Sequence, residues 1–386
     1  MYIRLISCCI LVVLLYACAT DVARKNTNSI YVDLDNIENE IPLDEYIDTS
    51  YYKIIPLTDN GAPIGEITKM KVVNDTIFIF DEQSNSINVY SETGQSILSL
   101  RSIGKASNEY IEIMDFDYSD GVIYIADNVK MSVMEYNMHG DFLKAVDVSP
   151  FWINKIFVLN TDIYLINDNS ETESGNYHLF QLDSNGNLIN SYNPFDIRER
   201  QSPTIYCNAN DGDAVLYGQC LDNIVYKVTG TECNELFSLD FGKYNMPREY
   251  WNMDVRQLKQ NNVAGVYAGG ISKLFVSENH VFVYVEDKDI NSVWIIYNKE
   301  KGKIEHVTKG FDINGFKFKS QLLSPVICGD YLYNPLSYET FVSLYEYIVK
   351  YQSDIIDSRY FKDLSDIYNC LHEDSSPVII KYRFKQ

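Results

Sequence analysis

The stretch VIYIADNVKMSVMEYNMHGDFLKAV, residues 122–146, decides how the chain folds. An alternating apolar run ends at Asp127, a second alternating run covers residues 132–137, and a turn centred on Gly140 follows. Alternation with a period of two residues predicts β-strands, and a glycine between two such runs predicts a hairpin. Whether this unit stands alone or repeats determines the architecture.

The unit repeats with an offset of 46 residues. The stretch TIFIFDEQSNSINVYSETGQSILSL, residues 76–100, places Asp81 and Gly94 where the first stretch has its aspartate and its hairpin glycine. One further clear copy and two weaker ones follow, at residues 162–192, 214–239 and 280–307. Repeats of about 40 to 50 residues, each with about four strands, are typical of the blades of a β-propeller.

We therefore predict an all-β fold, a six-bladed β-propeller. Five blades can be read directly from the sequence, at residues 67–101, 113–148, 153–194, 202–241 and 271–310. The sixth takes strands from residues 324–335 and 376–386, and the extended segment 50–58 completes it. Closure of this kind leaves no exposed sheet edge. A β-sandwich would also alternate, but it gives no reason for Asp, Gly and a tyrosine (Tyr90 and Tyr136) to keep one register.

The sequence also resembles a known group of proteins. Residues 102–144 are similar to the repeat of NHL-type propellers. The opening at residues 55–81 and the ending at 372–384 look like the six-bladed β-propeller lipoproteins of Bacteroides-type gut bacteria. This resemblance implies the fold and a lipid anchor. It implies no activity, because that family is largely without assigned functions and propellers host many unrelated ones.

A candidate ligand-binding loop follows from the same resemblance. In NHL-type repeats, the position of RSIGKASNEYIEI, residues 101–113, is a glycine-rich connection between blades near one mouth of the channel. The resemblance implies that this mouth is lined by Lys105, Asn108, Glu109 and Tyr110.

The N-terminus predicts export. Residues 1–17 form a signal peptide, with Arg4 ahead of an apolar run. The ending LYAC resembles a bacterial lipobox, which implies cleavage before Cys18 and lipidation of its thiol. Ordinary signal cleavage and a short uncleaved anchor are the alternatives. Residues 18–48 are expected to be an extended tether that joins the propeller, residues 49–386, to the outer membrane, facing the periplasm or the cell surface.

The composition excludes one class of partner. The formal net charge is −22 over 386 residues, with no basic block. Nucleic acids require a basic footprint, so we expect no nucleic-acid binding. The acidic residues are spread along the chain, which favours solubility over a dedicated cation site.

We expect neither a cofactor nor a transition-metal site. The five histidines form no HxxxH or HxH pair. Calcium stays open, because oxygen ligands from separate blades can meet on a propeller axis without a sequence motif. The five cysteines after Cys18 form no complete disulfide framework, and their pairing is undecided: Cys207, Cys220, Cys233, Cys328 and Cys370.

No catalytic motif is present, and we assign no catalytic residue. There is no GxSxG, GxGxxG or phosphate-binding P-loop pattern. Asp115 and Asp117 lie on one face of a predicted strand, where two buried carboxylates can do acid and base work. The favoured alternative is a blade turn whose aspartates bond to their own backbone.

Two segments break the repeat. In residues 242–270, helix-forming residues run from Arg248 to Gln260 and predict a helix between blades four and five. Arg248, Tyr250 and Trp251 are candidate ligand contacts, because aromatic side chains beside arginine are common at binding hot spots. The alternative is that both aromatic side chains only pin the helix to the blade.

The second segment, residues 336–372, predicts two helices within the last blade. Apolar residues recur on one helical stripe in 338–352 and in 359–371. We expect these stripes to pack on the propeller, with a partner-binding hairpin as the alternative.

The sequence predicts an envelope lipoprotein that acts as a binding module rather than an enzyme. Its ligand is a glycan, a peptide or a partner protein. A lyase or hydrolase with its site at the channel mouth, and a purely structural scaffold with a plugged channel, are the alternatives.

Overall fold

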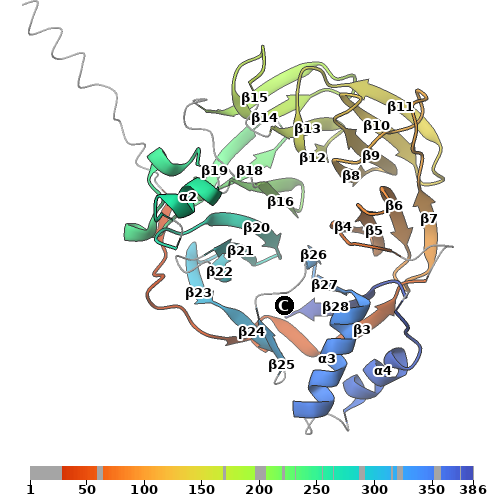
Figure 1. Cartoon of the computed structure of the whole chain (residues 1–386), viewed down its shortest axis with the longest axis vertical. Coiled ribbons are helices and arrows are strands. Elements are labelled where there is room, and N and C mark those ends of the chain that lie inside the picture. The colour runs from red at the N-terminus through yellow and green to blue at the C-terminus, as the bar shows by residue number, and fades with distance from the viewer. Residues whose placement is uncertain are drawn as a thin grey trace, which may run out of the picture.

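Six small sheets form a closed ring, and the predicted six-bladed propeller is confirmed (Figure 1). The computed structural model describes residues 28–58, 64–167, 171–195, 206–219, 222–230, 232–253, 255–263, 265–286, 292–313, 316–319, 325–351, 358–373 and 375–385. The predicted signal peptide and Cys18 lie outside these residues. No helix among the described residues is long and apolar enough to cross a membrane.

Each blade has its first strand at the axis and its fourth at the rim. Blades one to three consist of β4 (Lys69–Val73), β5 (Thr76–Asp81), β6 (Ser86–Tyr90), β7 (Ser96–Leu100); β8 (Asp115–Ser119), β9 (Val122–Asp127), β10 (Ser132–Asn137), β11 (Phe142–Asp147); and β12 (Ile153–Leu159), β13 (Asp162–Asn167), β14 (Tyr177–Leu182), β15 (Leu188–Pro194). Blades four to six consist of β16 (Tyr206–Asp211), β17 (Ala214–Gln219), β18 (Ile224–Thr229), β19 (Glu232–Asp240); β20 (Gly270–Val276), β21 (His280–Glu286), β22 (Ser292–Asn298), β23 (Lys303–Thr308); and β26 (Val326–Cys328), β27 (Tyr331–Leu336), β28 (Val378–Phe384), β3 (Ile47–Pro56).

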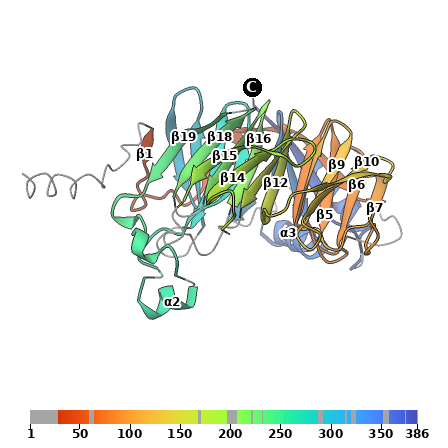
Figure 2. The ribbon, with the colours of Figure 1, turned by 90° about the horizontal axis from the view of Figure 1, so that it is seen from above.

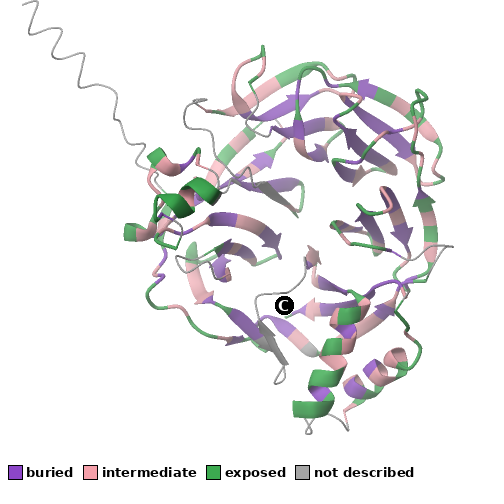
Figure 3. Cartoon of the chain, in the orientation of Figure 1, coloured by how far each residue is buried: buried purple, intermediate pink, exposed green. Residues whose placement is uncertain are grey.

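The last blade closes the ring by joining the two ends of the chain. The N-terminal strand β3 pairs with the C-terminal strand β28, in a register that runs from Val378 opposite Pro56 to Phe384 opposite Ile47. The closure predicted from residues 50–58 is therefore confirmed. Buried residues lie mainly on the inner strands of the blades, whereas exposed residues are common along the rim and on the helices (Figure 3).

The repeated aspartate fastens the chain where it enters each of the first two blades. Asp127 ends β9, and its carboxylate accepts the backbone N–H of Ile111 at 2.7 Å and that of Val129 at 2.9 Å. Ile111 belongs to the segment that leads into the same blade. Asp81 makes the equivalent contacts in blade one. Buried carboxylates need such donors, which explains why the repeat keeps an aspartate there.

The repeated glycine serves both the turn and the packing between blades. Gly94 has a φ of +81°, which suits glycine in a hairpin turn. A Cβ atom at Gly94 would lie 2.2 Å from the backbone oxygen of Pro56 in blade six. A Cβ atom at Gly186 would meet the backbone oxygen of Asp147 in blade two at the same distance. Larger residues would therefore push neighbouring blades apart.

Lysine and aspartate side chains tie together the innermost strands of the first three blades. Lys69 donates to both oxygens of Asp115 at 2.9 Å, and Asp115 accepts the backbone N–H of Ile156 at 2.9 Å. A second relay of the same kind runs through Lys71, Asp117 and Val158. Asp115 and Asp117 are therefore ties between blades. This role differs from both interpretations of the sequence, which were a carboxylate pair for acid and base catalysis and a turn whose aspartates bond to their own backbone.

The segment between blades four and five lies on the opposite side of the disc from the C-terminus (Figure 2). It contains η3 (Gly242–Tyr244), η4 (Arg248–Tyr250) and α2 (Val255–Gln260). The single helix predicted from Arg248 to Gln260 is wrong in extent. The first turn is closed by 3₁₀-type bonds, such as the one from the Trp251 N–H to the Arg248 carbonyl at 3.1 Å.

The two helices predicted inside the last blade are present, as α3 (Tyr338–Tyr351) and α4 (Arg359–Tyr368). Phe341 and Ile348 of α3 are fully buried, and Leu364 of α4 is 1 % exposed. All three side chains join the core of blades five and six. The expected packing of these stripes on the propeller is therefore confirmed.

Residues 28–46, here called the strap, follow the rim of blades four to six instead of forming a free tether. β1 (Ser29–Tyr31) adds a parallel fifth strand to β19, and Val32 and Leu34 are then buried against blades four and five. β2 (Ile41–Pro42) next pairs with β24 (Gly310–Ile313), which forms a hairpin with β25 (Phe316–Lys319). The expected extended tether therefore does not describe residues 28–48.

The thiols of Cys233, Cys328 and Cys370 are free. The side chain of Cys207 and all of Cys220 lie outside the described residues, so the pairing considered for them stays untested.

Truncation of a buried side chain of the strap tests its contribution to stability. Leu34 is 3 % exposed, so we expect Leu34→Ala to lower the free energy of unfolding by about 2 to 5 kcal/mol. Tyr31 is 65 % exposed, and Tyr31→Ala should cost less than about 0.5 kcal/mol. Urea unfolding measures both. Equal, small effects would mean that the strap is not part of the cooperative fold.

Candidate functional site

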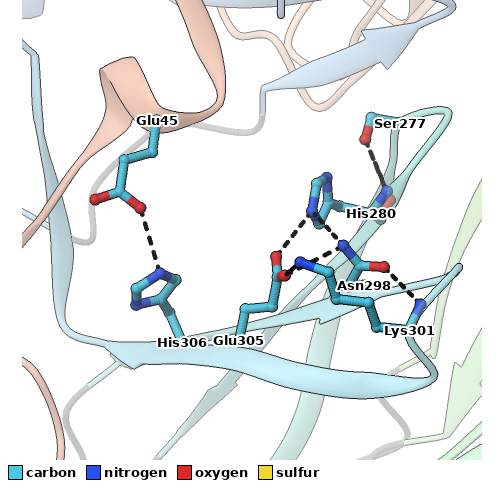
Figure 4. Close-up of polar contacts among 7 residues, drawn as sticks. All are labelled: Glu45, Ser277, His280, Asn298, Lys301, Glu305 and His306. Carbon is cyan, nitrogen blue, oxygen red and sulfur yellow. Dashed lines mark hydrogen bonds and ion pairs between the residues drawn. The ribbon is translucent and has the colours of Figure 1, made fainter. Parts of the chain in front are cut away.

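A polar cleft of about 500 Å³ lies between blades five and six, and we call it the blade-five cleft. Its walls come from the strap, from the hairpins of blade five and from the ends of β26 and β28. Figure 4 shows the side chains that face one another there: Glu45, Ser277, His280, Asn298, Lys301, Glu305 and His306.

Glu305 reaches this cleft because β23 contains a β-bulge. The ladder with β22 pairs Ile304 and His306 but skips Glu305. The same bulge occurs in blades one to four, where the extra residue is apolar: Ile97, Leu143, Ile189 and Leu236. A bulge redirects a side chain without ending the strand. Blade five therefore puts a carboxylate at a position that blades one to four fill with Ile or Leu.

His280 and Glu305 form an oriented pair. His280 begins β21, and its Nε2 lies 3.0 Å from Oε2 of Glu305. Because an ionised carboxylate can only accept, the contact with Glu305 requires the proton on Nε2, which leaves Nδ1 as the acceptor of the neutral ring. The Nδ2 atom of Asn298 lies 3.3 Å from the same Nε2 and, in this tautomer, does not donate to it. The backbone N–H of His280 also donates to Oγ of Ser277 at 3.1 Å. These contacts fix the imidazole at the cleft wall.

Three donors keep Glu305 ionised. Lys301 Nζ lies 2.7 Å and Asn298 Nδ2 3.2 Å from its Oε1, and His280 is the third donor. Burial raises the pKa of the Glu305 carboxyl, but the donors outweigh it and the pKa is lowered. Burial lowers the pKa of His280, and Glu305 opposes this only in part. At neutral pH the pair is a neutral imidazole beside a carboxylate.

The strap supplies the opposite wall and holds it in place through His306. His306 Nδ1 lies 2.8 Å from Oε1 of Glu38, and its Nε2 lies 3.4 Å from Oε2 of Glu45. The ring of Tyr46 meets the His280 ring edge-on, with 5.1 Å between the centroids. The cleft therefore depends on two segments that are 235 residues apart, measured from Glu45 to His280.

The cleft opens beside the mouth of the axial channel. A hollow of about 800 Å³ at this mouth shares Ser277, Glu278, Gly329 and Asp330 with the cleft. A scaffold with a plugged axis was one of the alternatives, whereas the described residues enclose open hollows. In this part of the chain, no three His, Cys, Asp or Glu side chains are grouped as metal ligands.

The candidate loop entering blade two lies away from these hollows and folds back on itself. Tyr110 is fully buried, and its hydroxyl lies within 3.1 Å of the carbonyls of Asn85 and Leu100. Glu109 accepts the N–H of Ala106 within the loop. Tyr110 therefore has a packing role. Lys105 and Asn108 are exposed, and ligand binding by them stays a prediction.

The candidates in the segment between blades four and five are also outside the cleft. Trp251 is 9 % exposed, and its indole N–H donates to the carbonyl of Met246 at 3.0 Å. The Arg248 guanidinium lies 5.5 Å from the Trp251 ring, while Tyr250 packs beside Tyr267. These contacts favour the packing alternative for Trp251. Ligand binding by Arg248 and Tyr250 is untested.

The sequence contained one signal for the cleft that was missed. Three residues after the hairpin glycine, blades one to three have Ile97, Leu143 and Ile189. The same offset from Gly302 in blade five gives Glu305. A polar residue at one copy of a repeated apolar position points to a specialised blade. The strap side of the cleft had no comparable signal.

Comparison with known proteins identifies the family but not an activity. The family model described as a domain of unknown function, DUF4934, matches residues 29–383. The chain belongs to this family. The DUF4934 match begins within the strap, so the strap is part of the family's fold. No curated protein sequence matches the chain.

Solved structures agree on the fold of this DUF4934 chain. One is a Bacteroides fragilis protein that is inferred to be exported. It is 16 % identical to this chain, covers 93 % of this chain and 99 % of its own, and has a TM-score of 0.67. A duf4221 family member from Bacteroides vulgatus is 9 % identical over 88 % and 97 %, with a TM-score of 0.52. A streptogramin B lyase is more distant, at 13 % identity over 73 % and 80 % and a TM-score of 0.42. The expected NHL-type relationship finds no support here and stays a prediction.

Removal of the Glu305 charge tests the oriented pair. Glu305 favours the protonated imidazole, so Glu305→Gln should lower the pKa of His280 below its wild-type value. NMR titration of the histidine ring signals measures this shift, and His280→Gln assigns the signal. Glu300→Gln, in the same hairpin but outside the cleft, is the control. An unchanged or raised pKa of His280 in Glu305→Gln would contradict the pairing.

Proposed function

We propose that this DUF4934 protein is an exported binding protein that holds a short neutral glycan in the blade-five cleft. The observation that carries the proposal is the chemistry of the cleft wall. Ligand sites are mostly apolar with a few polar groups. This wall is the reverse, because hydrogen-bonding side chains dominate it.

Charges of both signs face the cleft in nearly equal number. The carboxylates are Glu45, Glu278, Glu305 and Asp330, and the ammonium groups are Lys301, Lys303 and Lys385. Sugar hydroxyls both donate and accept, so they can use both sets of groups at once. A strongly charged ligand would meet as much repulsion as attraction. A neutral, polyhydroxylated ligand therefore suits this wall best.

The cleft offers little to an apolar side chain. Its two aromatic residues, Tyr46 and Phe384, are 6 % and 9 % exposed, so neither presents an open ring face. Peptide sites rely on pockets for apolar or aromatic anchors. The peptide that was considered from the sequence is therefore the weaker alternative.

An envelope location agrees with this role. The proposed signal peptide and lipidation at Cys18 would anchor the propeller to the outer membrane, with the strap as the first folded segment after the anchor. The likeness to a Bacteroides fragilis protein described by inference as exported supports export. The acidic composition supports the proposal that nucleic acid is not a partner.

One observation favours an enzyme as the second candidate. His280 is held by Glu305 in the orientation of a general base, and burial lowers its pKa, which favours the neutral ring that a base needs. In a lyase or hydrolase, Nδ1 of His280 would take a proton from a substrate or from water in the cleft. Among the described residues the cleft holds no histidine-activated nucleophile, which limits this candidate to proton transfer.

Binding of neutral trisaccharides tests the proposal. Maltotriose, cellotriose, xylotriose and chitotriose are titrated calorimetrically into the folded chain. For the member that binds, Glu305→Gln and His280→Gln should weaken binding at least about tenfold, since each loses a hydrogen bond to a charged partner. Glu300→Gln should bind like the wild type.

The same samples separate binding from catalysis. Mass spectrometry of the sugar after long incubation should find it intact if the protein only binds. Products that form with the wild type and disappear with His280→Gln would establish the enzyme instead. Equal affinity of Glu305→Gln and the wild type, with melting temperatures matched, would rule out this cleft as the site.

A further inference from the structure

The axial channel is chemically unlike the rest of this acidic protein. It encloses about 300 Å³ and is lined by the innermost strands of all six blades (Figure 1). Its lining shares no residue with the blade-five cleft. Among the described residues, four lysines line the channel, namely Lys69, Lys71, Lys155 and Lys273. Two carboxylates face them, those of Asp117 in the lining and of Asp115 beside it.

Three of these lysines occupy the same position in different blades. At this position of the innermost strand, the residue pairs with the one eleven positions further on, in the second strand. It is filled by Lys69, Asp115, Lys155 and Lys273 in blades one, two, three and five. Side chains at equivalent positions of a propeller lie at one height around its axis. The channel therefore has a level at which three ammonium groups face one carboxylate, in the blades whose side chains are described there.

Only one of the three charges at this level is neutralised. The Lys69 ammonium is paired with Asp115, and its Nζ lies 2.9 Å from both carboxylate oxygens. Neither Lys155 nor Lys273 forms an ion pair with any residue that the structure describes. The Lys273 ammonium lies 5.6 Å from the centroid of the Tyr284 ring, which attracts a cation but does not cancel its charge.

Burial makes the charge of Lys273 costly without a counter-ion. Burial lowers the pKa of Lys273, and no neighbouring carboxylate opposes that shift. Two like charges in one narrow channel also repel each other. Because the whole chain carries −22, solvent anions are not drawn to its surface in general, and a cationic channel is a local exception.

We propose that the axial channel is an anion site, in which a carboxylate or phosphate group lies between Lys155 and Lys273. Both groups offer oxygens that accept from two ammonium donors at once. This site is separate from the proposed glycan cleft and does not depend on it. It gives the protein a second ligand, an acidic small molecule or an acidic substituent carried on a larger one.

Inorganic phosphate and succinate are the probes. Each is used at about 1 to 10 mM, the range in which weak sites for small ions become occupied. Sodium chloride keeps the ionic strength constant, because screening alone changes stability. The readout is the melting temperature of the full folded chain, followed by calorimetric titration of the better probe. An anion that binds only the folded state must raise the midpoint.

The variants are Lys155→Met, Lys273→Met and the double variant, with Lys362→Met on the exposed face of α4 as the matched control. We expect at least one probe to stabilise the wild type and Lys362→Met equally. Each single channel variant should weaken its binding about tenfold or more, and the double variant should lose it. Glu305→Gln should keep it, which separates this site from the cleft.

Two results would overturn the proposal. One is an equal shift of the wild type and the double variant, which would assign the effect to general salt action. The other is the absence of any shift in the wild type with both probes. We expect all variants to fold, because each substitution removes a charge that has no ion-pair partner among the described residues. The two single variants also give the result independently of the double variant. A response to phosphate but not succinate, or the reverse, selects the anion class.

Discussion

The ring must close, because no blade can bury its two faces alone. Each sheet packs only against its two neighbours, so an open ring would expose two apolar faces and two sheet edges. The pairing of β3 with β28 provides the closure, from Ile47 opposite Phe384 to Pro56 opposite Val378. Blade six thus belongs to both ends of the chain. The strap directly precedes β3 in the chain. It runs along the rim and extends the same closure over blades four and five.

Because the blades offer equivalent positions, a different residue in one blade can create a site that the other blades lack. The bulge residue of the outer strand faces solvent as Ile97 in blade one, yet as Glu305 it orients a histidine in blade five. At one position of the innermost strand, blade two has Asp115, whose carboxylate ties neighbouring blades together. Blade three has Lys155 at the same position, and this lysine forms no ion pair with the described residues. The fold is set by what the blades share, and the candidate sites lie where one blade departs from the others.

The sequence predicted most of the fold because its signals are local. The 46-residue offset, the aspartate at the end of the second strand and the hairpin glycine each act within one blade or on its neighbour. The strap was not predicted, because the alternation of Ile30, Val32 and Leu34 lies in a segment whose polar composition favours an extended tether. The cleft was missed because it brings Glu45 and Tyr46 of the strap against blade five, and a contact between segments so far apart in the chain leaves no local pattern. The single helix expected after Pro247 failed because tertiary contacts, including the buried Trp251, overrode helix propensity.

Hydrogen exchange with and without the tightest-binding neutral trisaccharide tests most directly that blade five holds the ligand site. The cleft proposal predicts slower exchange in the two hairpins that contain residues 277–280 and 298–306, and in the strap at Glu45 and Tyr46. Exchange should be unchanged in the loop at residues 102–110 and in the segment at 248–251. Protection confined to either of those two segments, with the hairpins of blade five unaffected, would contradict the account.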